Sequence, residues 1–193
     1  MLVPLILVIA VFCTRLLTLT GDLAVVANLS PVIALTVCGA AFFKRRWEIA
    51  LPLIAFLVSD IIINLAYGVS AIGSHTLVAL AVYGLIALGG LGLRGGEKRQ
   101  LPMLGATLAG TLLFYLITNT ASFFMSAGYV KSFDGWIQCL TVGLPGFPPT
   151  WSFLLKSLGS NLVFTGIFCL VFQTRKSKEG AAVPVSSESA ALS

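Results

Sequence analysis

Charged residues are scarce in this sequence. Asp, Glu, Lys and Arg together make up 10% of its 193 residues, and there is a single histidine. Hydrophobic residues make up 58%, and the mean hydropathy is +1.00. A water-soluble domain of this length could not cover so much apolar surface. The composition therefore argues against a soluble protein and favours one that lies within a membrane.

The sequence also lacks the groupings that catalysis or metal binding needs. Its four cysteines show no metal-ligand spacing, and His75 stands alone as an interfacial polar residue. There is no Gly-x-x-x-x-Gly-Lys-Ser/Thr phosphate loop, and no serine or cysteine has an evident base. We therefore expect no enzymatic activity, no metal and no cofactor. We interpret Cys13, Cys38, Cys139 and Cys169 as small hydrophobes without a disulfide framework.

Six long apolar stretches divide the chain. The hydrocarbon core of a bilayer is about 30 Å thick, and about 20 residues of α-helix cross it. The sequence thus predicts an all-α, polytopic membrane protein with a six-helix bundle in residues 1–172. Residues 173–193 contain few large apolar residues and are expected to form a disordered cytoplasmic tail. The expected spans are 2–19, 24–43, 49–67, 76–93, 101–125 and 151–172.

Positive charge follows every second apolar stretch. Cytoplasmic loops collect Lys and Arg, so we expect the three basic clusters and both termini on the cytoplasmic side of a bacterial inner membrane. The net charge of +5 could suggest nucleic acid. However, the basic residues lie at helix ends rather than on one face, so we expect no nucleic-acid partner. The clusters are Lys44, Arg45 and Arg46; Arg94, Lys98 and Arg99; and Arg175, Lys176 and Lys178.

The second stretch contains a helix start in its interior. Ser30 followed by Pro31 is typical of an N-cap and first turn, and a helix from there to Phe43 would be only about 20 Å long. Residues 23–29 then form either a helical turn before a proline kink or a non-helical segment in the outer leaflet. In the second case the helix N-terminus would point its free amides into a cavity. The sequence leaves both alternatives open.

Polar residues within the spans gather in the half away from the basic clusters. Asp60 lies about 10 Å below the outer end of its span, with Asn64 one turn further out on the same face. Ionisable groups at this depth cost at least about 2.5 kcal/mol each, so they normally find partners or face a wet cavity. One interpretation is a structural clip, in which Asp60 pairs with Arg15 or Lys156. The other is an outward-facing pocket, in which the surplus cation accepts an anionic group. The expected substrate-binding residues are Arg15, Asn28, Asp60, Asn64, Asn119, Trp136, Gln138, Lys156 and Asn161.

A long outer loop, residues 126–150, follows the fifth stretch. Its glycines and prolines forbid a continuous helix, and it carries several aromatic residues, including Trp136 close to Gln138. Long ordered loops are often lids or binding elements, so we expect this loop to lie over the pocket. An aromatic belt at the membrane interface is the alternative, and it explains Trp151 equally well.

Three stretches resemble an uncharacterised family of bacterial six-helix membrane proteins. They are residues 28–35 with 39–43, residues 51–53 with Ser59-Asp60, and Thr118-Asn119 with Tyr129 and residues 135–140. That family is itself similar to the substrate-binding S-components of energy-coupling-factor (ECF) vitamin transporters. The resemblance implies a protein that captures a small solute from outside. It also implies a separate transmembrane coupling protein and two cytoplasmic ATPases as partners.

The sequence as a whole favours binding or uptake of a small anionic or zwitterionic solute. A channel would need polar lining through both leaflets, whereas the inner halves of the third and fifth stretches are nearly apolar. The alternative is a structural or assembly subunit of a membrane complex, without a ligand of its own. In that case the polar residues only join helices.

Overall fold

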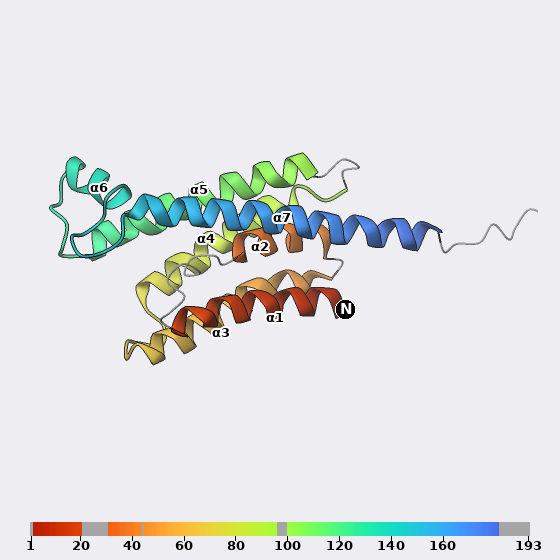
Figure 1. Ribbon diagram of the computed structural model, residues 1–193, viewed down its shortest axis with the longest axis horizontal. Helices are drawn as coiled ribbons and strands as arrows, with labels where there is room; N and C mark the ends of the chain where they lie inside the picture. The colour runs from red at the N-terminus through yellow and green to blue at the C-terminus, as the bar shows by residue number, and fades with distance from the viewer. Residues whose placement is uncertain (1, 21–30, 44, 96–99, 182–193) are drawn as a thin grey trace, which may run out of the picture.

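The computed structural model describes residues 2–20, 31–43, 45–95 and 100–181. Within these ranges every regular element is helical, which confirms the all-α prediction. Seven α-helices and two 3₁₀ helices form an elongated bundle (Figure 1). Their bounds are α1 Leu2–Leu16, η1 Leu17–Thr20, α2 Val32–Phe42, η2 Arg46–Ala50, α3 Leu51–Ala66, α4 Ser74–Leu91, α5 Gln100–Met125, α6 Phe133–Leu140 and α7 Thr150–Ala181.

Four helical segments in the described residues are long and apolar enough to cross a membrane. They are Trp47–Ala66, Ser74–Leu91, Gln100–Met125 and Thr150–Val171, and they correspond to the last four expected spans. The first two expected spans contain shorter α-helices, of 15 residues in α1 and 11 residues in α2. At 1.5 Å per residue α2 is about 16 Å long. It begins at Val32, directly after Pro31. The two alternatives for the preceding segment concern residues 23–29, which lie outside the described residues.

The short helix α2 lies at the centre of the bundle. It packs against α1, α3, α4, α5 and α7, and every residue from 32 to 41 is buried. Its sequence is apolar on all sides, and a helix of that kind is stable when it is surrounded by protein. Gly90 of α4 permits the close approach, because a Cβ there would lie 2.9 Å from both the Cβ of Ala40 and the carbonyl oxygen of Val37.

Side chains from two distant segments cap both ends of α2. A helix end leaves backbone groups without intrahelical partners, and these groups need other partners when the end is buried. At the N-terminal end, Oδ1 of Asn161 on α7 accepts a hydrogen bond from the N–H of Ala34 at 3.0 Å. At the C-terminal end, Arg94 donates to the carbonyl oxygens of Ala40 at 2.7 Å and Phe43 at 3.0 Å. Arg94 therefore serves the packing of the core in addition to its expected role as a topology signal.

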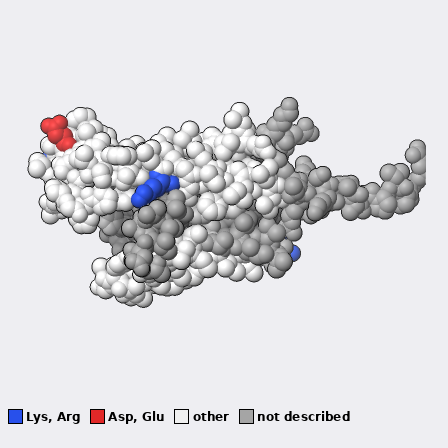
Figure 2. Space-filling model, in the orientation of Figure 1, with Lys and Arg blue, Asp and Glu red and all other residues white. Residues whose placement is uncertain are grey.

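The two ends of the bundle differ in character. The start of α1 and the final turns of α2, α4 and α7 lie at one end (Figure 1), which we call the basic end because it carries Arg45 and Arg94. The other end, which we call the loop end, carries α6 and the connection between α3 and α4. The described part of the flank between them is mainly uncharged, apart from a Lys or Arg side chain near its middle (Figure 2), and a mainly uncharged flank suits contact with a lipid bilayer. The side of the membrane that holds the basic end stays a prediction.

Two segments differ from the expectations. The outer loop has no continuous helix, but it contains α6, whose first turn is capped by Oγ of Ser132 on the N–H of Gly135 at 3.1 Å. Within the described residues there is thus one α-helix more than the six expected spans, and this helix, α6, has 8 residues and is too short to cross a membrane. In addition, α7 continues past residue 172 to Ala181, into the segment that was expected to form a disordered tail from residue 173. The Gln, Arg, Lys and Glu residues there are good helix formers, and a helix that already exists extends at little cost.

Candidate functional site

A cavity of about 610 Å³ lies near the loop end, between α1, α3, α4, α5 and α7. This volume is within the range of roughly 300–1,000 Å³ that is typical of small-molecule sites. Its walls combine charged, polar and aromatic side chains. The polar residues that line it are Arg15, Asp60, Asn64, Ser70, His75, Thr76, Thr118 and Ser157.

An ion pair forms part of the cavity wall. Nη2 of Arg15, in the last turn of α1, lies 2.9 Å from Oδ1 of Asp60 in α3, and Nε of Arg15 donates to Oγ of Ser59 at 2.7 Å. The guanidinium group also lies over the ring of Phe56, 4.5 Å from its centroid, where the π electrons attract a cation. The exposed fractions of the Arg15 and Asp60 side chains are 15% and 19%. The pair is thus mostly removed from solvent and yet presents both signs of charge to the cavity.

The second carboxylate oxygen of Asp60 connects α3 to α4. Thr76, in the first turn of α4, donates to Oδ2 of Asp60 at 2.6 Å, and Nδ2 of Asn64 lies 3.4 Å from the same oxygen. Asn64 also donates to the carbonyl oxygen of Ala71 at 3.2 Å. Because Asn64 follows Asp60 by four residues on one helix, the two side chains share a face. Asp60 therefore ties α1, α3 and α4 together at the cavity.

Three aromatic rings form part of the apolar wall. Tyr83 stacks on Phe114 of α5, with 4.8 Å between the ring centroids, and meets Phe56 edge-on at the same centroid distance. All three residues line the cavity, and Tyr83 is 4% exposed. Aromatic walls with a few oriented polar groups are typical of sites that bind small organic molecules. The arrangement can therefore hold an apolar body next to a pair of opposite charges.

The structure brings three of the expected binding residues to this wall: Arg15, Asp60 and Asn64. Asn161 is fully buried at the N-terminal end of α2, where its Nδ2 donates to the carbonyl oxygen of Ser157 at 2.8 Å. Asn161 therefore caps a helix and does not line the cavity.

Three further expected residues lie elsewhere in the described chain or outside it. Nδ2 of Asn119 donates to the carbonyl oxygen of Tyr115, one turn back on its own helix, at 2.7 Å. Lys156 is half-buried on α7, and it is not among the residues that line the cavity. Asn28 lies outside the described residues. Contact of these residues with a substrate stays a prediction.

Trp136 and Gln138 belong to α6 and take part in the packing of the loop end. Nε1 of Trp136 donates to Oγ1 of Thr120 at 3.0 Å, and Nε2 of Gln138 donates to the carbonyl oxygen of Gly143 at 3.1 Å. Burial and a hydrogen bond with Cys139 of α6 raise the pKa of Tyr129 to about 12. The described lining of the cavity includes no residue of α6, so a role of α6 as a lid also stays a prediction.

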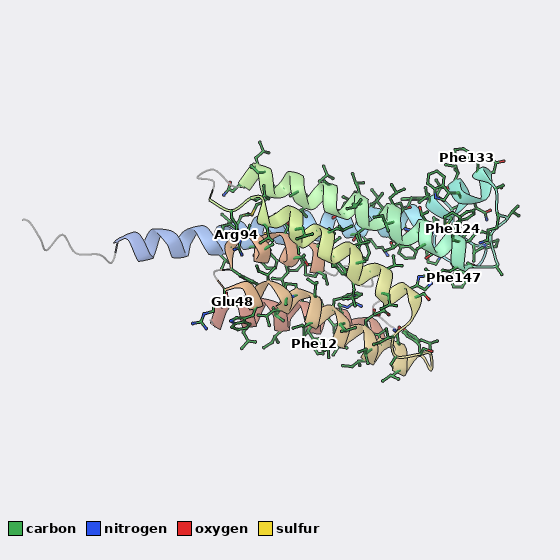
Figure 3. The ribbon with its side chains drawn as sticks, turned by 180° about the vertical axis from the view of Figure 1, so that it is seen from behind. Phe12, Glu48, Arg94, Phe124, Phe133 and Phe147 are labelled. Carbon is green, nitrogen blue, oxygen red and sulfur yellow. The ribbon has the colours of Figure 1, made fainter. Side chains whose placement is uncertain are left out.

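The rings of the outer loop gather at the same end. Figure 3 shows Phe124, Phe133 and Phe147 at this end of the bundle, whereas Glu48 and Arg94 lie at the basic end. Phe124, Phe133 and Phe147 are exposed. Exposed aromatic rings at one level of a bundle fit a membrane–water interface.

Family membership covers nearly the whole chain. DUF6580, described as a family of unknown function, matches residues 1–183. The chain belongs to the DUF6580 family. Neither a curated protein nor a solved structure matches it. The function of this DUF6580 protein must therefore be inferred from the chemistry of its own cavity. Its similarity to ECF S-components stays a prediction.

Several residues that line the cavity of this DUF6580 protein were not predicted from the sequence as binding residues. Thr76 and Phe56 contact the ion pair directly, but a threonine at a helix start and a phenylalanine in an apolar run carry no distinguishing signal. His75 also lines the cavity, and its Nδ1 lies 3.5 Å from Oγ of Ser122. One clue was present: Phe56 precedes Asp60 by four residues, which places it on the same face of α3.

Proposed function

We propose that this DUF6580 protein is a membrane protein that binds a small zwitterionic solute with an apolar or aromatic body. The observation that carries the proposal is the pair of Arg15 and Asp60 on the wall of a cavity that also contains three aromatic rings. A zwitterion offers a carboxylate to Arg15 and an ammonium group to Asp60 through charge-assisted hydrogen bonds. Its body packs against the rings. A purely anionic solute is less well matched, because the second deep cation, Lys156, does not line the cavity.

The packing between the cavity and the basic end supports binding rather than conduction. α2 occupies the axis of the bundle there, and Leu35, Val37 and Cys38 on it are at most 1% exposed. Met103 of α5 and Phe168 of α7 pack into the same apolar core. A channel requires polar lining through both leaflets, whereas this half is closed by apolar side chains. Transport of a bound solute would need a partner or a large rearrangement.

Uptake in this proposal uses an energising complex on other chains. The sequence contains no phosphate loop that could bind ATP. The similarity to ECF S-components that we predict from the sequence implies a transmembrane coupling protein with two cytoplasmic ATPases. The loop end would then face outward, with the basic end in the cytoplasm. The protein alone in liposomes should bind its solute without moving it across the membrane.

Thermal unfolding of the purified protein in detergent tests the binding. The probes are L-phenylalanine and L-leucine, compared with phenethylamine and 3-phenylpropionate, which each keep one of the two charges of phenylalanine. A ligand at 100 times its Kd stabilises the folded state by about 2.7 kcal/mol. We expect a zwitterion to raise the melting temperature and each singly charged analogue to raise it less. Equal stabilisation by the carboxylate alone would indicate an anion site, and no shift with any probe would contradict the proposal.

A double variant separates solute binding from folding. Replacing Asp60 alone would leave the mostly buried charge of Arg15 without its partner, which is strongly destabilising. Arg15→Gln combined with Asp60→Asn removes both charges together, so the fold should persist while the response to the zwitterion is lost. Ser152→Ala is the matched control, because Ser152 is a half-buried polar residue away from the cavity wall. It should respond to the probes as the wild type does.

A structural or assembly subunit is the second candidate. One observation favours it: both oxygens of Asp60 already have partners, Arg15 on Oδ1 and Thr76 with Asn64 on Oδ2. In this case the ion pair is a clip between α1, α3 and α4. The clip predicts that no probe shifts the melting of the wild type and that the double variant loses stability in the absence of any ligand.

A further inference from the structure

Three sulfur atoms meet in the buried core between α2, α5 and α7. Sδ of Met103 lies 4.0 Å from Sγ of Cys38 and 3.7 Å from Sγ of Cys169. The exposed fractions of Cys38, Met103 and Cys169 are 0%, 0% and 2%. This sulfur cluster is separate from the cavity, whose lining includes none of the three residues.

We propose that the sulfur cluster binds a soft monovalent cation of the Cu(I) class. Thiolate and thioether sulfurs are the protein ligands that select Cu(I) over harder cations. A metal–thiolate bond is about 2.3 Å long in zinc sites, and three sulfurs at about that distance in one plane lie about 4.0 Å apart. The two distances to Met103 match the edges of such a triangle. A cation can therefore enter between the sulfurs with small changes of side-chain position.

Charge balance and coordination number together favour a monovalent ion at this position. On binding, the S–H bond of one thiol breaks, its proton leaves to solvent, and a thiolate–metal bond forms in its place. The other thiol and Met103 bind through sulfur lone pairs, so the thiolate cancels the charge of the ion and no net charge is buried. A divalent ion such as Zn²⁺ would need both thiols in the thiolate form and also a fourth ligand, because structural zinc sites are four-coordinate. Among the described residues no group of three His, Cys, Asp or Glu side chains gathers to supply one.

The three residues lie far apart in the sequence, which explains why the spacing of the cysteines did not predict a metal site. Each sulfur comes from a different helix, and the contacts of Met103 span 65 residues to Cys38 and 66 residues to Cys169. The other two cysteines provide internal controls. Cys13 is exposed on α1, and Cys139 lies in α6, where its thiol donates to the carbonyl oxygen of Asn119 at 3.3 Å.

Metal titration of the reduced, full-length protein in detergent tests the proposal. Cu(I) is supplied from a bathocuproine disulfonate buffer, and Ag(I) serves as a redox-inert second probe. We expect one ion per chain and loss of that ion in Cys38→Ala and Cys169→Ala. Cys13→Ala and Cys139→Ala should retain it. Met103→Leu keeps the side-chain volume but removes one ligand, so we expect the affinity to fall by at least about tenfold.

X-ray absorption spectroscopy at the copper edge gives a readout that does not depend on variants. Three sulfur neighbours and no nitrogen neighbours are expected in the loaded wild type. Retention of the ion in both Cys38→Ala and Cys169→Ala would overturn the proposal, as would Zn(II) binding of equal affinity. No uptake by wild-type protein, both after purification and from cells grown with added copper, would also overturn it. If the alanine variants fail to fold, the wild-type spectrum and Met103→Leu decide the question.

Discussion

Replacing Asn161 with alanine tests whether α2 depends on a cap supplied by α7. Oδ1 of Asn161 accepts a hydrogen bond from the N–H of Ala34 at 3.0 Å, and Nδ2 donates to the carbonyl oxygen of Ser157 at 2.8 Å. The exposed fraction of Asn161 is 0%. Alanine removes both bonds and leaves the N–H of Ala34 without this acceptor. A buried donor without a partner costs about 1–3 kcal/mol, and loss of an N-cap costs about 0.5–2 kcal/mol. We therefore expect the free energy of unfolding to fall by about 2–3 kcal/mol.

Asn119→Ala is the matched control for this prediction. Nδ2 of Asn119 donates to the carbonyl oxygen of Tyr115 at 2.7 Å, four residues earlier on its own helix, as Asn161 does with Ser157. However, the side chain of Asn119 is half-buried. We expect this variant to lose about 1 kcal/mol or less. The difference between the two variants isolates the contribution of the cap.

Equilibrium unfolding in mixed micelles with a rising fraction of SDS, followed by circular dichroism, measures both variants. The two unfolding curves should separate by more than the error of the control. Equal losses of stability would refute the argument that α7 caps α2, because the bond within the helix would then explain the whole effect. An unchanged stability of Asn161→Ala would refute it as well.

Two further predictions follow from the packing and from the charge pattern. Gly90→Ala should destabilise the fold by about 1–3 kcal/mol because its Cβ would meet the backbone of α2. Gly89→Ala, where a Cβ meets open space, should be neutral or stabilising by up to about 1 kcal/mol. Equal changes in stability for the two variants in the same unfolding assay would contradict the close approach of α2 and α4. In a variant without native cysteines, a membrane-impermeant maleimide added to intact cells should label a cysteine placed at Asp134 and not one placed at Arg45. Labelling of both positions from outside would contradict the proposed orientation.

The ion pair at the cavity illustrates what a sequence alone can predict. Arg15 and Asp60 stand out because charged groups within a span are expensive and must find partners. The sequence offered Arg15 and Lys156 as partners of Asp60, and the structure pairs Asp60 with Arg15. Phe56 and Thr76 could not be identified in the same way. Their residue types are common in spans, and only the packing of α1 and α4 on α3 brings them to the pair.

The rotation of a helix about its axis is a second limit of sequence analysis. Asn161 was expected in the binding site because of its depth, but its direction depends on the position of α2, which the sequence does not define. The same holds for Cys38 and Cys169, which meet at Met103 only because three helices pack together. The start of α6, in contrast, was accessible from local chemistry. Ser132 as N-cap with Asp134 in the first turn is a recognisable helix start.

The caps of α2 also bear on the order in which the protein assembles in the membrane. The residues that satisfy its two ends lie much later in the chain: Arg94 follows Ala40 by 54 positions and Asn161 follows Ala34 by 127 positions. During synthesis α2 therefore emerges before either partner exists, and its 11 residues are too few to span the bilayer alone. A nascent chain that stops before α7 lacks both the N-terminal cap and one wall around α2. The synthesis of α7 is thus the step that allows α2 to reach its final place.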